Sequence, residues 1–285
     1  MAPLVYLVTG CGSGFGASFV RQIADRGDLV IATARDTSKL LKVQGHSITH
    51  LQLDVTWPAE KLHKVAKAAI QIHGRVDVLI NNAGYVATGL MEDMLPNDLL
   101  QQFNTNVFGP VHVTNAFLPY LRSQRSGVIV FIGSLSAWAS SAGGGAYSAS
   151  KAALAQIALA YEAELSPFGI RTLLVEPGFF RTALLTPGNL SQSRSNSSER
   201  QNQEYDELRN SLSQSLSMYN GNQPGDPEKA VSSTLDLVTE SGTAAGKKVV
   251  RVCLGTDAVG IIKDASTKAR QLVVEWEDFS RATDF

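Results

Sequence analysis

The sequence has few of the features that mark several large classes of protein. Among its 285 residues are only two cysteines, Cys11 and Cys253, far apart and without metal-site spacing, which predicts free thiols in a reducing compartment. No apolar run approaches 18 residues, and no basic segment of a signal peptide precedes the first apolar run. We therefore expect a cytoplasmic chain with no membrane span.

Neither sign of charge is in excess. The formal net charge is -1 and the pI is about 6.5, with no basic run, so nucleic acid is not expected as a partner. The five histidines fit no metal or triad pattern, and no metal site is expected. A hydrophobic content of 44% is sufficient for a large core, and the length suits a single α/β unit.

Short β-branched runs alternate with longer helical segments along the whole chain. This alternation predicts an α/β fold, with a doubly wound parallel sheet of about seven strands and helices on both faces. We expect one domain over residues 1–285, with strands at about 4–9, 29–34, 48–53, 76–81, 127–133, 170–176 and 248–252. Helices are expected at about 14–26, 57–73, 96–123, 145–166, 227–240 and 257–280.

A glycine turn follows the first predicted strand directly. The segment Gly10-Cys-Gly-Ser-Gly14-Phe-Gly16 leads into a helical stretch, and Gly12, Gly14 and Ala17 fit the Gly-x-Gly-x-x-Gly/Ala pattern. Glycines let the backbone approach phosphates, while the helix N-terminus supplies N–H groups and a partial positive charge. The pattern predicts a Rossmann-like dinucleotide site, and a glycine turn without a ligand is the alternative.

Tyr147 and Lys151 lie four residues apart in an Ala-rich segment without Gly or Pro inside it. On a helix these residues share one face, about 6 Å apart along the axis. A free tyrosine has a pKa of about 10, and a nearby lysine charge favours the phenolate and lowers that pKa. The pair predicts acid–base chemistry, although an Ala-rich helix also carries such a pair by chance.

Further motifs join these two in one order and spacing. They are Thr9-Gly-x-x-x-Gly14-x-Gly16, Asn81-Asn-Ala-Gly84, Asn106, Ser134, Tyr147-x-x-x-Lys151, and Pro177-Gly178 with Thr182. In these motifs the chain resembles the short-chain dehydrogenase/reductase family over about its first 185 residues. The Thr-Gly-Cys-x-x-Gly-Phe-Gly opening, and Ala-Arg-Asp after the second strand, look like the branch that acts on steroids, retinoids and secondary metabolites.

The resemblance implies four catalytic residues: Asn106, Ser134, Tyr147 and Lys151. Tyr147 would exchange a proton with the substrate oxygen, and Ser134 would hydrogen-bond that oxygen. Lys151 would lower the pKa of Tyr147 and bond the nicotinamide ribose.

Asn106 would bend its helix and hold a water that links Lys151 to solvent. Asn104 competes with Asn106 for this role, and Ser136 competes with Ser134 for the place in the site.

The resemblance also implies a cofactor site. Its expected residues are Gly10, Ser13, Gly14, Phe15, Gly16, Arg35, Asp54, Val55, Asn82, Ala83, Gly84, Tyr147, Lys151, Pro177, Gly178, Phe180 and Thr182. Asp54 would bond the adenine amino group, although an Asp at a strand end is also an ordinary turn residue.

The end of the second strand bears on the choice of cofactor. Ala34 has no group to bond a ribose hydroxyl, whereas the planar fork of Arg35 suits a 2′-phosphate, so NADP(H) is expected over NAD(H). Asp36 is the counter-argument, because a tighter turn would bring its carboxylate to the ribose. The segment Asp36-Thr-Ser-Lys also has the pattern of a helix N-cap.

Residues 186–225 are dense in Ser, Asn and Gln. Five apolar residues recur there at helical spacing: Tyr205, Leu208, Leu212, Leu216 and Tyr219. Because the segment follows the Pro177-Gly178 turn, we expect a substrate lid over 183–225, with a helix packed on the domain edge as the alternative. The expected pocket walls are largely apolar: Tyr85, Leu135, Trp138, Phe179, Phe180, Leu184, Leu185 and Met218.

Taken together, these patterns favour an NADP-dependent carbonyl reductase or alcohol dehydrogenase. It would transfer a hydride between NADP(H) and a ketone or secondary alcohol on a fairly large apolar substrate, with Tyr147 as acid and base. Non-redox chemistry on the same fold (dehydration, isomerisation or cyclisation) and a dinucleotide-sensing binding protein are the alternatives. The helices expected at about 96–123 and 145–166 carry more small and apolar residues than one buried face needs. This excess favours a homodimer or homotetramer.

Overall fold

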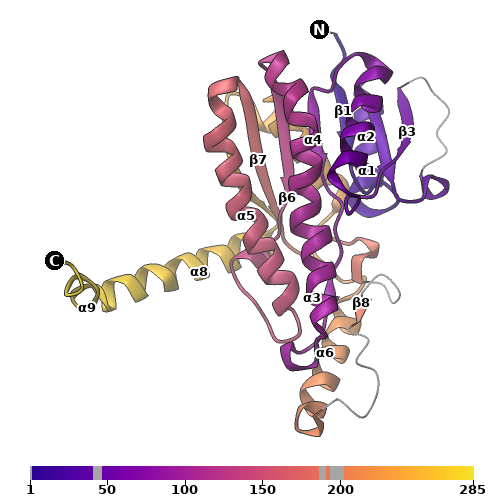
Figure 1. Cartoon of the computed structure of the whole chain (residues 1–285). Helices are drawn as coiled ribbons and strands as arrows, with labels where there is room; N and C mark the ends of the chain where they lie inside the picture. Colours follow the sequence, from indigo (N-terminus) through magenta and orange to yellow (C-terminus); the bar gives the residue numbers. More distant parts are fainter. Residues whose placement is uncertain (1, 41–46, 186–190, 193–201) are drawn as a thin grey trace.

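A seven-stranded parallel sheet forms the centre of the molecule, described here from a computed structural model for residues 2–40, 47–185, 191–192 and 202–285. The strand order is β3-β2-β1-β4-β6-β7-β9 (Figure 1). The strands are β1 (Val5–Val8), β2 (Leu29–Ala34), β3 (Ile48–Gln52), β4 (Val78–Asn81), β6 (Gly127–Ile132), β7 (Ile170–Pro177) and β9 (Arg251–Leu254). The chain reverses its direction of travel across the sheet between β1 and β4, which creates the switch point where such sheets bind ligands.

Helices cover both faces of the sheet, so the predicted fold class is confirmed. They are α1 (Gly14–Asp25), α2 (Ala59–His73), α3 (Pro96–Phe103), α4 (Gly109–Gln124), α5 (Gly145–Leu165), α6 (Asp206–Tyr219), α7 (Pro227–Thr239), α8 (Thr256–Glu275) and α9 (Glu277–Arg281). One apolar core lies between the sheet and α2, α4 and α5, and the other between the sheet and α1 and α7. Burial on both faces explains why the strands are almost wholly apolar.

Two predicted helices are corrected by the structure. The expected helix at 96–123 is divided into α3, a π-helical turn at Asn104–Phe108, and α4. The division agrees with the expected bend at Asn106, which lies inside the π turn. The expected helical region near 257–280 is likewise two helices, α8 and α9, which meet at Trp276.

Smaller differences concern strands. The last strand of the sheet begins three residues later than expected, at Arg251. A second sheet of two short strands, β5 (Ala87–Thr88) and β8 (Ser191–Gln192), was not expected from the sequence. Both cysteines are free, as expected, and no helix among the described residues is long and apolar enough to cross a membrane.

Candidate active site

Close backbone packing requires glycine at two positions of the turn between β1 and α1. Gly10 has φ +73°, and a Cβ atom there would lie 2.8 Å from Ala83 Cα. A Cβ atom at Gly16 would collide with the Gly10 carbonyl oxygen. Ser13 is the N-cap of α1 but makes no side-chain capping bond, and the first turn of α1 has no acidic residue. The N–H groups of this helix end therefore suit an anion.

Side-chain hydrogen bonds join this turn to the loop after β4. The Thr9 hydroxyl accepts from the backbone N–H groups of Asn82 and Ala83, at 3.0 Å each. The Asn82 side chain donates in return to the carbonyl oxygens of Thr9 and Gly10, at 2.8 and 3.1 Å. The two loops that flank the switch point are thus fixed relative to each other.

The segment after β7 lies over the same turn. A Cβ atom at Gly14 would be 3.5 Å from the Cβ atom of Thr182. The rings of Phe15 and Phe180 pack edge to face, with 5.4 Å between their centroids. Four residues expected in the cofactor site are therefore brought together here.

Asp257 holds the Pro177-Gly178 turn and was not recognised from the sequence. Its carboxylate accepts from the Phe179 backbone N–H at 2.6 Å. A Cβ atom at Gly178 would collide with the same carboxylate, so a side chain there would displace Asp257. The partners are 78 residues apart in sequence, and no local pattern signals the contact.

Ser134, Tyr147 and Lys151 meet where β6 ends and α5 begins. The Ser134 side chain hydrogen-bonds the Tyr147 phenol. The Lys151 Nζ atom lies 5.8 Å from the centre of the Tyr147 ring and donates to the Ile132 carbonyl oxygen at 2.7 Å. Ser134 also accepts from the Ser136 backbone N–H at 3.1 Å, so Ser134 rather than Ser136 presents its hydroxyl to the phenol.

Burial shifts the pKa values of both titrating groups in this cluster. Desolvation raises the pKa of Tyr147, and the hydrogen bond with Ser134 acts in the opposite direction. Desolvation lowers the pKa of Lys151 to about 8. The raised pKa of Tyr147 differs from the lowering expected from the lysine charge, because desolvation by burial is the largest cause of the shift.

Asn106 is fully buried and connects three parts of the site. Its amide exchanges two hydrogen bonds with the Tyr85 backbone, at 3.0 and 3.1 Å, and donates to Ser150 Oγ at 3.2 Å. Ser150 in turn donates to the Tyr147 carbonyl oxygen at 2.7 Å. The π turn points this amide into the site, whereas Asn104 lies at the start of the turn and is only half-buried. Ser150 occupies one of the unspecified positions inside the Tyr147-x-x-x-Lys151 motif, and its role was not recognised from the sequence.

A buried ion pair supports the loop after Ser134. Glu176 is 1% exposed, and Arg251 donates to both of its carboxylate oxygens at 2.7 Å. The Trp138 indole N–H donates to the same carboxylate at 2.8 Å, and the Arg251 guanidinium stacks over the Trp138 ring at 4.1 Å. Trp138, expected as a pocket wall, is therefore also an anchor of its loop.

The expected lid is a helix attached to several loops at this end of the sheet (Figure 1). Arg209 on α6 donates to both carboxylate oxygens of Asp93, at 2.8 and 3.0 Å. The Leu212 side chain would meet a Cβ at Gly143, and Tyr219 packs against Phe179 with 4.9 Å between ring centroids. These contacts reach loops that follow β4, β6 and β7.

Part of the expected lid falls outside the described residues, and one expected pocket wall is exposed. Residues 186–190 and 193–201 lie outside the described residues, and so does the Leu185 side chain. Met218, expected as a pocket wall, is 69% exposed, so the structure does not bury it in a pocket.

The residues expected at the adenosine end lie at the ends of β2 and β3. Arg35 is exposed directly after β2. Asp36 caps the short 3₁₀ helix Thr37–Lys39 and accepts from the N–H and hydroxyl of Ser38 at 3.0 and 2.7 Å, as its N-cap pattern predicted. Asp54 accepts in the same way from the N–H and hydroxyl of Thr56, at 2.9 and 2.7 Å. Val55 is buried.

Comparisons with known proteins agree with this geometry. A family model described as short chain dehydrogenase matches residues 4–192. Oxidoreductase BOA17 of Botryotinia fuckeliana is 30% identical over 283 residues, 98% of each chain, and oxidoreductase claN of Passalora fulva is 40% identical over 188 residues, 64% of this chain and 85% of that protein. The crystal structure of a short-chain dehydrogenase from Streptomyces avermitilis has a TM-score of 0.87 at 37% identity, with 99% of each chain covered. The chain belongs to the short-chain dehydrogenase/reductase family of oxidoreductases.

Proposed function

We propose that the protein is an NADP-dependent oxidoreductase that transfers a hydride between NADP(H) and a ketone or secondary alcohol on a fairly large apolar substrate. The observation that carries the proposal is the cluster of Ser134, Tyr147 and Lys151 at the end of β6, where the phenol is hydrogen-bonded to the serine and near the ammonium. These are the groups needed to bind a carbonyl oxygen and deliver a proton to it.

The residues around the switch point fit a dinucleotide. The uncapped N-terminus of α1, which follows the tight glycine turn at Gly10 and Gly16, suits a pyrophosphate. Asp54 and Val55 would flank the adenine, the segment 82–84 would follow the adenosine, and the segment 177–182 would cover the nicotinamide half. When bound, the nicotinamide supplies or accepts the hydride.

In the reducing direction, Tyr147 donates its proton to the substrate oxygen as negative charge develops there. Its raised pKa keeps the phenol protonated before reaction, as an acid requires. Ser134 holds the same oxygen, and the Lys151 ammonium stabilises the phenolate that remains. Asn106 positions α5 through Ser150 and the Tyr147 carbonyl.

The preference for NADP(H) is supported by the chain that follows β2. Arg35 is exposed there, while Asp36 uses one carboxylate oxygen to cap the helix Thr37–Lys39. The fold alone does not decide the cofactor, because solved proteins of this fold at 23% and 21% identity are in complex with NADP and with NAD respectively.

The single domain over 1–285, with the segment 183–225 as its substrate lid, also belongs to this proposal. It is supported by the contacts of α6 with loops after three strands. A helix over the strand ends would exclude water from a large apolar substrate.

The test is a panel of ketones and secondary alcohols, with the absorbance of NADPH and NADH followed during turnover. We expect cofactor consumption with apolar ketones, faster with NADPH, and a reduced NADPH preference in Arg35→Ala. Lys64→Ala, which removes an exposed cation on α2, is the control. Turnover without cofactor consumption would favour the non-redox alternative, and cofactor binding without turnover would favour a sensor.

A further inference from the structure

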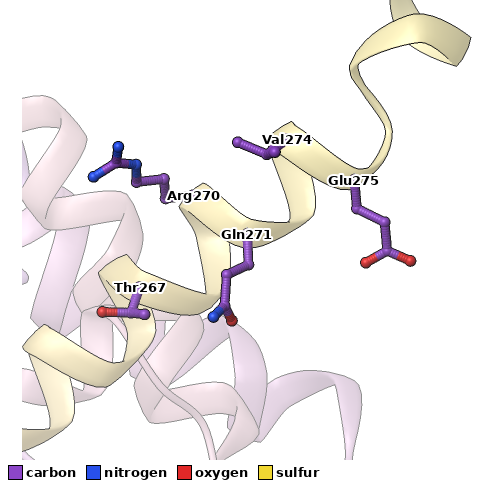
Figure 2. A pocket seen from close by; sticks show the side chains of 5 residues that line it. All are labelled: Thr267, Arg270, Gln271, Val274 and Glu275. Carbon is purple, nitrogen blue, oxygen red and sulfur yellow. The ribbon is translucent and has the colours of Figure 1, made fainter.

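The helix α8 begins on the body of the protein and then leaves it (Figure 1). Ile261, Ile262 and Ala265 are half-buried, whereas every residue from Ser266 to Phe285 is exposed. We name residues 266–285 the arm. Figure 2 shows the distal turns of α8 extending away from the other elements in view, with Arg270 and Val274 on one side and Gln271 and Glu275 on another.

An apolar stripe runs along α8 and continues into the arm. Its residues alternate at spacings of three and four: Ile262, Ala265, Ala269, Leu272, Trp276 and Phe279. This spacing is typical of a helix that packs against another helix along a seam. The stripe touches the body only at its start, since Leu272 is 60% exposed and Phe279 is 70% exposed.

The exposed part of the stripe is large for a helix without a partner. The rings of Trp276 and Phe279 pack edge to face at 5.6 Å, and together they expose on the order of 250 Å² at 49% and 70% exposure. A single helix in water is marginally stable, so an arm of this length gains most from a partner helix. A standard specific interface buries about 800 Å² per partner, and the two rings alone would supply about a third of that area.

We infer that the arm pairs in antiparallel orientation with the arm of a second copy of this chain. A two-fold axis at the level between Arg270 and Gln271 aligns the two stripes. Within α8, Ala269 of each copy then meets Leu272 of the other, and Trp276, at the end of α8, lies level with the small residue Ala265. A parallel pairing would instead place Trp276 on Trp276 and Ala269 on Ala269, which packs poorly.

Charge complementarity selects the same orientation. Lys268 and Glu275 are two turns apart on one side of the stripe, and both are exposed. In the antiparallel pair, Lys268 of each arm lies opposite Glu275 of the other, so two opposite-charge contacts form. In a parallel pair these positions would face Val273 and Ser280, and no charge contact would form.

The test uses charge reversal and light-scattering mass over a range of concentrations. Lys268→Glu and Glu275→Lys each place like charges opposite each other twice. We expect each variant alone to halve the assembled mass, or to weaken association about tenfold. Arg270→Glu, on the side of α8 away from the stripe, is the matched control and should leave the mass unchanged.

Two further experiments should restore the assembled mass only if the arms pair in the antiparallel register. The double variant Lys268→Glu/Glu275→Lys should regain the wild-type mass, and an equal mixture of the two single variants should regain it although neither variant does so alone. Trp276 emission should shift to shorter wavelength whenever the arms pair. A wild type with single-chain mass at all concentrations, single variants with wild-type mass, or failure of the mixture to associate would each overturn the inference.

Discussion

At the scale of the residue, burial governs the chemistry of the site more than charge pairing does. Tyr147 and Lys151 share one edge of α5, as their spacing predicted. Desolvation nevertheless favours the neutral form of each group. It raises the pKa of the phenol and lowers the pKa of the ammonium. The phenol is therefore protonated before reaction, as the proposed acid in carbonyl reduction requires.

Tyr147→Phe removes the hydroxyl and keeps the ring. We expect turnover to fall by about 10²–10⁴-fold, the usual contribution of a positioned acid, with cofactor affinity unchanged. The matched control is Tyr161→Phe, a buried tyrosine of the same helix whose hydroxyl donates to Asn115 at 2.8 Å outside the site. Steady-state rates and cofactor titration measure both, and near-wild-type turnover in Tyr147→Phe would exclude its role as the acid.

The lowered pKa of Lys151 predicts a dependence of stability on pH. Because the pKa is about 8 in the folded chain and 10.5 ordinarily, the unfolded chain binds more protons between these values. The contribution of this group to the free energy of unfolding therefore rises with pH from about 8 to 10.5. Below that window the buried ammonium destabilises the folded chain by its full amount.

Lys151→Met abolishes this rise. The loss of the hydrogen bond to the Ile132 carbonyl gives a constant offset, so the stability of the variant relative to wild type should decrease as pH rises through the window. Urea unfolding at several pH values measures the difference, with the exposed Lys64→Met as control. A relative stability that does not change between about pH 7.5 and 10 would contradict burial of the ammonium.

At the scale of the element, the spacing of apolar residues and the residue types at the ends of helices and strands predicted most of the fold. Strands β1 and β4 are buried on both faces and have continuous apolar runs. Helix α7 begins at Pro227, as expected, and Asp226 caps it by accepting from the Glu228 N–H at 2.9 Å. The division of the helix at 96–123 was not predictable as a π turn, because that choice depends on the contacts of the Asn106 amide with the Tyr85 backbone. Side-chain links between distant segments leave no local signal.

The lid helix shows how few contacts can hold an element. No residue of α6 is fully buried, yet Arg209, whose side chain is 18% exposed, pairs with the almost buried Asp93. Arg209→Met removes both hydrogen bonds to Asp93 while keeping the stem of the side chain. We expect faster proteolysis within 202–225 and a KM raised several-fold, with kcat less affected.

Arg281→Met is the control for that change. Arg281 also pairs with a carboxylate, Glu277 at 2.9 Å, but the pair is exposed and lies outside the lid, so it contributes little. Equal proteolysis of the two variants and the wild type would show that the pair with Asp93 does not hold α6.

At the scale of the whole molecule, the ion pair of Glu176 and Arg251 ties the edge of the sheet to the site. It joins β7 to the edge strand β9 and, through Trp138, to the loop that begins at Ser134. Glu176→Gln leaves Arg251 without its charged partner, and we expect a loss of about 3–5 kcal/mol in the free energy of unfolding. Glu176→Gln/Arg251→Met removes both charges and should recover much of that loss in urea unfolding, whereas equal losses in both would exclude the charge as the cause.

The assembly predicted from the sequence has its own surface on α4 and α5. The outer face of α5 carries the exposed small residues Ala149, Ala160 and Ala163, and such residues let two helices approach closely. Ala160→Arg places a long charged side chain in this face without touching the core, and we expect it to halve the mass of the assembly. Ala59→Arg, at the exposed start of α2, is the control.

Because the arm and the face on α4 and α5 are separate segments of the chain, we expect the effects of their variants to add. Ala160→Arg should leave a pair held by the arms, and Lys268→Glu a pair held by α4 and α5. The two changes together should give the single chain of 30.5 kDa. Sedimentation measures all three masses, and a combined variant that stays assembled would show that a third surface joins the copies.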